Sequence, residues 1–259
     1  DFARVIGARG YDKSRRPPCT NGTLQGPTIV EVQLRLTQVN EIDQKRGTAT
    51  VNGYFRSWWN DPGLKFDYPN FFCPDILHLH GDDASALWQP DLYFDNLVEK
   101  IGAAGFPSSL SVDCTGRVFR SEQVRLQVKF PMTLGRFPYD DHVVEIIVAS
   151  YSLTNSDLRI VPGGGVLGDG ASGIGISAPQ IPSVFWSFPN DLAADPSQGF
   201  ETPGVVETTD GREFVALQIP ISRESKFYID QVIIPCQLFL DLSYMQFFVP
   251  ASAVPARAA

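Results

Sequence analysis

The segment Phe130–Tyr151 (FPMTLGRFPYDDHVVEIIVASY) constrains the fold of this 259-residue chain more than any other. Two strand-like runs, Val124–Phe130 and Val143–Tyr151, flank a Phe-Pro-Tyr-Asp turn at residues 137–140. Such a loop is short, restricted by proline and tipped with aromatic side chains, which suits a stiff surface lever better than a catalytic pocket. The segment therefore predicts two strands joined by a rigid loop.

The rest of the first 226 residues carries the same kind of pattern. From Thr28 the apolar side chains alternate with polar ones, which is typical of a half-buried strand. The charged turn Glu41–Gly47 then leads into a second strand, Thr48–Trp58. Because 20 Pro and 22 Gly provide many turns between short strands, we expect an all-β domain, an Ig-like antiparallel β-sandwich over residues 28–226, after a leader segment at 1–27. Another strand is expected near Leu87.

The character of the chain changes at Lys226. The segment Phe227–Val249 is apolar and long enough to span ~30 Å of hydrocarbon as a helix. Pro235 should kink that helix. The alternative is a buried soluble strand and helix, which Asp230 and Asp241 favour because a carboxylate in a bilayer is costly. As a membrane helix over 227–250, the segment would turn Asp241 toward a helix bundle or a water-filled cavity.

Composition excludes some classes of function. A net charge of −8 argues against a nucleic-acid partner, which needs clustered Lys and Arg. The apolar context of Cys236 predicts a free, buried thiol, whereas Cys19, Cys73 and Cys114 could supply one disulfide in any pairing. Asn21 begins an Asn-Gly-Thr glycosylation acceptor.

Several motifs occur in an order that matches a known family. They are Trp59-Asn60-Asp61, Trp88-Gln89-Pro90-Asp91 with Asn96, the turn Asp113–Gly116, Phe137-Pro138-Tyr139-Asp140, Ser150-Tyr151, the apolar run around Pro235, and Val254-Pro255-Ala256-Arg257. Together they resemble the pentameric ligand-gated ion channels, the Cys-loop receptor superfamily, from about residue 28 to the end. The two positions of the family's disulfide are Phe130 and Val144 here, as in prokaryotic members that lack the bridge.

The resemblance implies a subunit with an extracellular sandwich, the first transmembrane helix at 227–250 and a short linker, 251–259, that begins the pore-lining helix. Its expected location is the plasma membrane, in a homo- or hetero-pentamer. The family has four transmembrane helices, and the sequence stops where the second would begin. The sequence therefore leaves open an incomplete chain or an unusual single-span relative.

The resemblance also implies an agonist site between neighbouring subunits. Tyr54, Tyr93 and Tyr151 would contribute to an aromatic cage, with the carboxylate of Asp95 beside it. Aromatic faces attract ammonium groups, so an amine or amino acid agonist is expected. The opposing face would present Ser121, Gln123 and Arg125, and the capping loop 190–212 would present Phe200 and Glu201.

Gating residues would gather at the membrane end of the sandwich. We expect a charged cluster there, and neutralising Asp140 or Arg223 should impair gating or assembly. The implied residues are Glu41, Asp43, Phe137, Pro138, Asp140 and Arg223. Arg257 would lie at the entrance of the pore, where a ring of arginines favours anions.

Two rival functions remain at this stage. An enzyme is disfavoured because Asp82-Asp83 and Asp140-Asp141 are adjacent pairs that point to opposite strand faces and cannot converge on one substrate. His78 and His80 lack an obvious third metal ligand, and we expect no metal or other cofactor. A single-span or soluble β-sandwich without channel activity is the second rival, against which the apolar segment at 227–249 argues.

Overall fold

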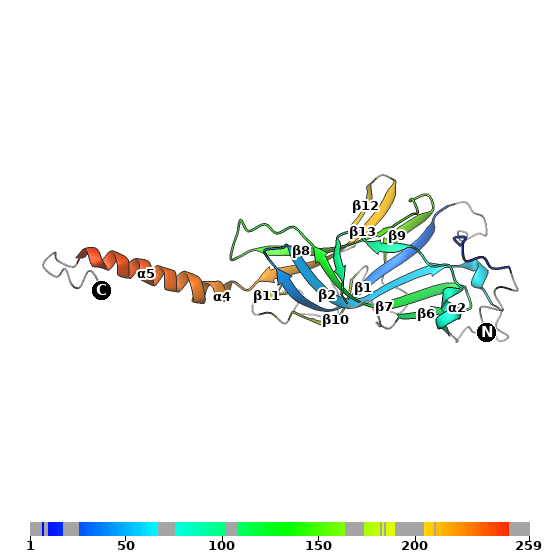
Figure 1. The fold of residues 1–259 in the computed structure, drawn as a ribbon, viewed down its shortest axis with the longest axis horizontal. Helices are drawn as coiled ribbons and strands as arrows, with labels where there is room; N and C mark the ends of the chain where they lie inside the picture. The colour runs from blue at the N-terminus through cyan, green and yellow to red at the C-terminus, as the bar shows by residue number, and fades with distance from the viewer. Residues whose placement is uncertain are drawn as a thin grey trace.

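A computed structural model describes residues 10–17, 26–66, 76–101, 108–163, 174–181, 185–189, 205–209 and 211–248, with the single positions 7 and 183. Two β-sheets pack face to face, and a helical segment projects from one end of them (Figure 1). The predicted sandwich followed by a helix is confirmed.

The larger sheet has eight strands, of which six form a continuous order, β10-β1-β2-β7-β6-β3. Strand β5 pairs with β7, and β9 pairs with β1. The strands are β1 (Thr28–Asp43), β2 (Thr48–Asn60), β3 (Leu77–Leu79), β5 (Leu97–Lys100), β6 (Ser108–Val112), β7 (Arg117–Lys129), β9 (Leu158–Pro162) and β10 (Ile174–Gln180).

The smaller sheet has five strands in the order β11-β13-β8-β4, with β12 paired to β13. Its strands are β4 (Leu92–Phe94), β8 (Asp141–Ser150), β11 (Trp186–Ser187), β12 (Val205–Thr209) and β13 (Arg212–Arg223). The two strands expected around the Phe-Pro-Tyr-Asp turn are β7 and β8, and they belong to different sheets. The turn therefore crosses from one layer of the sandwich to the other.

The expectation of antiparallel sheets needs one correction. Most pairs are antiparallel, but β1 runs parallel to both β9 and β10. The chain leaves β8 in the smaller sheet and returns to the edge of the larger one beside β1, so the direction of these strands is set by that crossover. A sequence pattern of alternating residues shows which face is buried but not which way a neighbouring strand runs.

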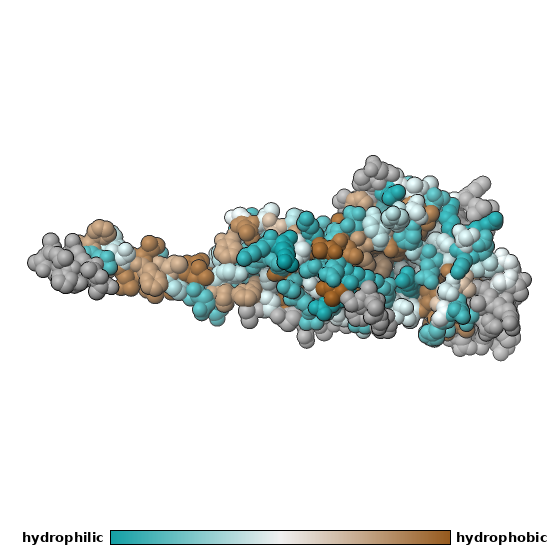
Figure 2. Space-filling view, in the orientation of Figure 1, coloured by the Kyte–Doolittle hydropathy of each residue, from teal (hydrophilic) through white to brown (hydrophobic). Residues whose placement is uncertain are grey.

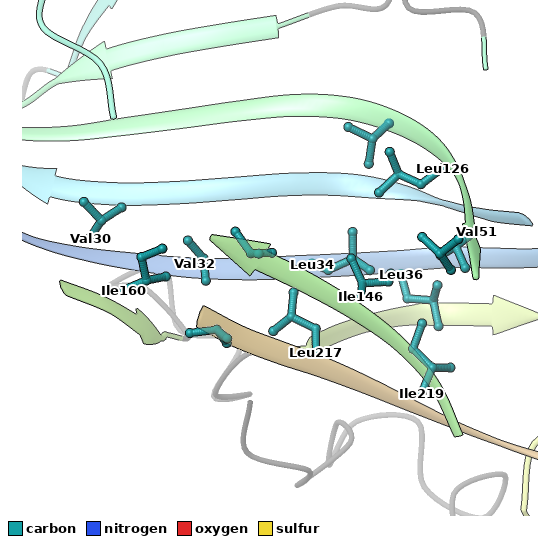
Figure 3. Close-up of a cluster of buried hydrophobic side chains, with 14 of the residues drawn as sticks. Val30, Val32, Leu34, Leu36, Val51, Leu126, Ile146, Ile160, Leu217 and Ile219 are labelled. Carbon is teal, nitrogen blue, oxygen red and sulfur yellow. The ribbon is translucent and has the colours of Figure 1, made fainter. Parts of the chain in front are cut away.

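The core lies between the two sheets. Four alternating apolar residues of β1 (Val30, Val32, Leu34 and Leu36) are fully buried. They face Ile146 of β8 and Leu217 and Ile219 of β13 (Figure 3). Phe130 and Val144 stand at the two positions of the family's disulfide, which this chain lacks. Both belong to this core.

Two details differ from the sequence expectations. Leu87 is buried but follows the short helix α2 (Gly81–Ser85) instead of lying in a strand. Cys236 is a free thiol, as expected, but it is exposed. Cys114 is disulfide-bonded, so its partner is Cys19 or Cys73, both outside the described residues.

The C-terminal segment is helical throughout 225–248 and carries exposed apolar side chains (Figure 2). Its parts are α4 (Ser225–Tyr228), the π-helical turn η2 (Ile229–Ile233), α5 (Ile234–Met245) and the 3₁₀ turn η3 (Gln246–Phe248). The π turn ends two residues before Pro235, whose missing N–H interrupts the regular bonding there. Within the described part of the chain, no helix is long and apolar enough to cross a membrane. The other short helix, the 3₁₀ turn η1 (Pro62–Leu64), follows β2.

Candidate functional site

Two clusters of candidate functional residues lie at the two ends of strand β8. At one end, β8 is joined to the loop before β4 through Asp91. The Asp91 carboxylate accepts hydrogen bonds from Ser150 Oγ at 2.6 Å and from the backbone N and side chain of Ser152. Burial alone would raise the pKa of Asp91, but these hydrogen bonds outweigh it and lower the pKa below its usual value. Asp91 therefore holds the loops carrying Tyr93 and Tyr151 together.

Tyr93, Asp95 and Tyr151 form one group on the outer face of the smaller sheet. The Tyr93 and Tyr151 rings meet edge to face, with centroids 6.0 Å apart, and Tyr93 Oη donates to Asp95 Oδ1 at 3.2 Å. Burial, and then the neighbouring Asp95 carboxylate, raise the pKa of the Tyr93 phenol. Tyr151 is 72% exposed, so an aromatic face remains open to a ligand. The structure thus brings together three residues that the sequence had placed in the ligand site.

A cavity of about 650 Å³ lies beside this group. Its walls include Arg212, Glu213 and Phe214 of β13, none of which the sequence singled out as a contact, although Arg212 is the last residue of the expected capping loop. Phe214 is opposite Ala149 in β8, which is opposite Tyr93 in β4, so the three lie in one row across the sheet. Only the pairing of β13 with β8 reveals this row, because sequence places the two strands more than sixty residues apart.

The other predicted ligand-site residues that the structure describes, Tyr54, Ser121, Gln123 and Arg125, lie on the opposite side of the sandwich. Tyr54 of β2 is directly opposite Gln123 of β7, and the neighbouring rows pair Arg56 with Ser121 and Asn52 with Arg125. These side chains alternate with the core residues of the same strands, so they occupy the outer face of the larger sheet. Arg35 of β1 is also opposite Tyr54, which makes this face rich in arginine. Within one chain Tyr54 therefore does not reach Tyr93 or Tyr151, and their meeting stays a prediction that requires a second copy.

The other end of β8 carries a buried charge cluster. Arg223 donates from Nε to Asp140 Oδ1 at 2.6 Å and from Nη2 to Oδ2 at 2.9 Å, and neither side chain is more than 3% exposed. His142 Nε2 lies 2.5 Å from Asp140 Oδ2. Burial raises the pKa of Asp140, but hydrogen bonds from Arg223 and His142 outweigh this and lower it. The expected pairing of Asp140 with Arg223 is therefore present, and both groups are buried rather than merely solvated.

Aromatic rings surround the Arg223 guanidinium. Its central carbon lies 4.3 Å from the centroid of Trp186, 5.0 Å from that of Phe137 and 5.3 Å from that of Tyr228. Phe137 also meets Tyr228 edge to face at 4.9 Å, and the following Pro138 is buried. The Phe-Pro-Tyr-Asp turn is thereby anchored to the first turn of the helical segment. Trp186 and Tyr228 were missed because the sequence offered no motif around either residue.

The β1–β2 turn reaches this cluster through a residue that the sequence did not single out. Gln44 Nε2 donates to Tyr228 Oη at 3.3 Å, and Arg223 Nη1 donates to the same oxygen at 3.0 Å. Asp43 instead accepts from the backbone N of Lys45 and Arg46 and caps its own turn. Among the described residues, neither Asp43 nor Glu41 forms an ion pair with Arg223; Glu41 lines a cavity of about 580 Å³ next to Tyr228.

Four of the predicted site residues, Asn21, Phe200, Glu201 and Arg257, lie outside the described residues. Within the ranges that are described, no group of three or more His, Cys, Asp or Glu side chains could hold a metal ion.

The sequence of this chain is similar to those of known protein families and proteins. Residues 5–165 match the family model described as neurotransmitter-gated ion-channel ligand binding domain. A glutamate-gated chloride channel of Drosophila melanogaster is 27% identical over 98% of this chain and 52% of its own length. A gamma-aminobutyric acid receptor subunit alpha-2 of Bos taurus is 25% identical over 99% of this chain and 53% of its own length. The chain spans about half the length of the curated relatives it matches.

Proposed function

Because this chain belongs to the neurotransmitter-gated ion channels of the Cys-loop superfamily, whose members are not enzymes, we propose that it is a subunit of a pentameric ligand-gated ion channel. An agonist would bind between subunits in the sandwich domain and open a transmembrane pore. The observation that carries this proposal is strand β8, which joins the Tyr93–Tyr151 group at one end to the buried Asp140–Arg223 pair at the other.

The agonist is proposed to be an amino acid. The Tyr151 and Tyr93 rings beside the Asp95 carboxylate suit an ammonium group. The outer face of the larger sheet, with Arg35, Arg56 and Arg125 around Tyr54, would meet it from the neighbouring subunit and attract anionic ligands. Two relatives are named for glutamate and gamma-aminobutyric acid, both amino acids.

The proposed domain order is a leader at 1–27, an extracellular sandwich at 28–226, a first transmembrane helix at 227–250 and a linker at 251–259. Exposed apolar side chains along 225–248, among them Phe239 at 72% and Phe247 at 78%, support a lipid or helix-bundle environment for the segment. The proposed location is the plasma membrane, and glycosylation at Asn21 is proposed on the sequence alone.

The pore is proposed to select anions. This rests on Arg257 at the expected pore entrance and on the naming of one relative as a chloride channel. The reversal potential of agonist-evoked current should follow the chloride gradient; a reversal potential that follows sodium would contradict anion selectivity.

The direct test is voltage clamp of cells that express the full-length chain, with a panel of amino acids and amines. Tyr151→Ala should raise the half-maximal agonist concentration about 2- to 30-fold, because a cation–π contact contributes about 0.5–2 kcal/mol. Tyr151→Phe keeps the ring and should stay close to the wild type. A wild-type chain that reaches the cell surface and passes no current with any compound would overturn the proposal.

A further inference from the structure

The cavity beside Tyr93 carries one acidic and one basic side chain that have no ion-pair partner in the described part of the chain. They are Asp95 on the β4 side and Arg212 at the start of β13, both exposed. Glu213 follows Arg212 directly in the sequence, but its carboxylate accepts a hydrogen bond from Arg159 Nε at 3.0 Å. The acid that could have neutralised Arg212 is therefore already paired.

The strand pairing of β13 determines the position of Arg212. Thr209 of β12 pairs with Arg212 of β13 across the hairpin, and Gly211 O accepts from Asn155 N at 2.9 Å, which anchors the turn end of that hairpin to the loop after β8. Arg212 is two residues before Phe214 and so lies on the same outer face of the sheet. Tyr151 is two residues after Ala149, the register partner of Phe214, so the continued register sets Arg212 opposite Tyr151.

The two charges act on the same phenol. Tyr93 donates to Asp95, and the positive charge of Arg212 partly offsets the rise in the pKa of Tyr93 that burial and Asp95 produce. Ala149 and Ile147 also line the cavity. The cavity thus presents the Asp95 carboxylate, the Tyr93 ring and the Arg212 guanidinium, and the Tyr151 ring packs edge to face against Tyr93.

We propose that Arg212 binds the carboxylate of the agonist while Asp95 and the tyrosine rings bind its ammonium group, so that one subunit face recognises both ends of an amino acid. This rests on the proposed function, which it deepens by assigning carboxylate recognition to the Tyr93–Tyr151 face of a single subunit. Simple amines satisfy only the Asp95 end, and dicarboxylates lacking an amine satisfy only the Arg212 end. A guanidinium suits this role because it can donate two parallel hydrogen bonds to one carboxylate.

The test compares ligands that differ by one carboxylate on the purified full-length chain and in voltage clamp. The pairs are glycine with methylamine, γ-aminobutyrate with n-propylamine, and glutamate with γ-aminobutyrate. Arg212→Gln should weaken the binding of γ-aminobutyrate or glycine by about 10- to 100-fold, the ratio expected for a lost charge-assisted hydrogen bond. Binding of methylamine and n-propylamine should be unchanged or tighter. Arg212→Lys should recover only part of the affinity.

Arg15→Gln is the control, because it removes the same charge at an 84% exposed side chain whose ion-pair partner, Asp12, lies outside the cavity. If Arg212→Gln leaves amino acid binding unchanged while Arg35→Gln or Arg125→Gln weakens it, the carboxylate is bound by the larger sheet and the inference is overturned, with the proposed function intact. Equal loss for amino acids and their amines would also overturn it. If the wild-type chain binds none of these compounds, the proposed agonist class and this inference fail together.

Discussion

At the residue scale, Asp140 determines how the turn before β8 is held. Its carboxylate accepts two hydrogen bonds from Arg223 and is in contact with His142, and all three side chains are buried. Removing the negative charge would leave the Arg223 guanidinium buried with no opposite charge beside it. Such an uncompensated buried charge strongly destabilises the folded protein. Four elements therefore depend on one carboxylate: the 137–140 turn, β8, β13 and, through the Arg223–Tyr228 contact, the helical segment.

Asp140→Asn should lower the free energy of unfolding at pH 7 by about 3 kcal/mol, as for other buried pairs that lose one partner. Because the pKa of Asp140 is lowered in the folded chain, its stabilising contribution is present above the unfolded pKa of about 4 and is lost as pH falls through the lower folded pKa. Denaturation of the wild type followed by tryptophan fluorescence should therefore show falling stability below about pH 4, and Asp140→Asn should show a shallower fall. The neighbouring Asp141 is exposed, so Asp141→Asn should behave like the wild type.

Tyr228 gives a second prediction at this scale. Its hydroxyl accepts from both Gln44 and Arg223, so it joins the β1–β2 turn to the buried pair. Tyr228→Phe keeps the ring contacts with Phe137 and Phe227 but removes both hydrogen bonds. We expect a smaller maximal current and an unchanged agonist dissociation constant, measured on the same chain. Tyr244→Phe, on the same helical segment, is the matched control; a loss of agonist binding in Tyr228→Phe would contradict a role in transmission.

At the scale of elements, strand β8 is the connection between the two clusters. Its Ser150 end is tied to the loop before β4 by Asp91, and its other end follows directly on Asp140. Since β8 is paired along nearly its whole length with β13, it can transmit a displacement as a rigid unit.

Asp91→Asn tests the tie at the ligand end. The variant keeps the size of the side chain but weakens the hydrogen bonds from Ser150 and Ser152, which favour the ionised carboxylate. The half-maximal agonist concentration should rise by about 5- to 30-fold, the equivalent of about 1–2 kcal/mol. The Asp140–Arg223 pair should be unaffected, so the acid dependence of unfolding below pH 4 should match the wild type except for the contribution of Asp91 itself. Unaltered agonist sensitivity would show that Asp91 does not position Tyr151.

Sequence patterns predicted the elements better than their connections. The alternation in β1 identified the face that carries Val30 to Leu36 as part of the core. In a strand with one buried face, every second side chain is apolar. The grouping of Tyr93, Asp95 and Tyr151 was implied by the resemblance that the motifs carry, and not by periodicity. Arg212, Trp186 and Tyr228 were missed because each owes its position to long-range strand pairing or ring packing, which local patterns do not encode.

At the scale of the whole molecule, the two candidate ligand faces are the outer faces of the two sheets. A sandwich holds these faces back to back, so one chain cannot bring Tyr54 to Tyr151. Two copies can do so if the outer face of the larger sheet in one meets the outer face of the smaller sheet in the next. Such a head-to-tail contact uses a different surface on each partner, and it closes into a ring when the rotation between neighbours divides the circle evenly.

Single-particle electron microscopy of the detergent-solubilised full-length chain with bound amino acid tests this claim most directly. The account predicts a ring of five subunits, with ligand density between the Tyr93–Tyr151 face of one subunit and the Tyr54–Gln123 face of the next. Particles without five-fold symmetry, or ligand density away from these two faces, would contradict it.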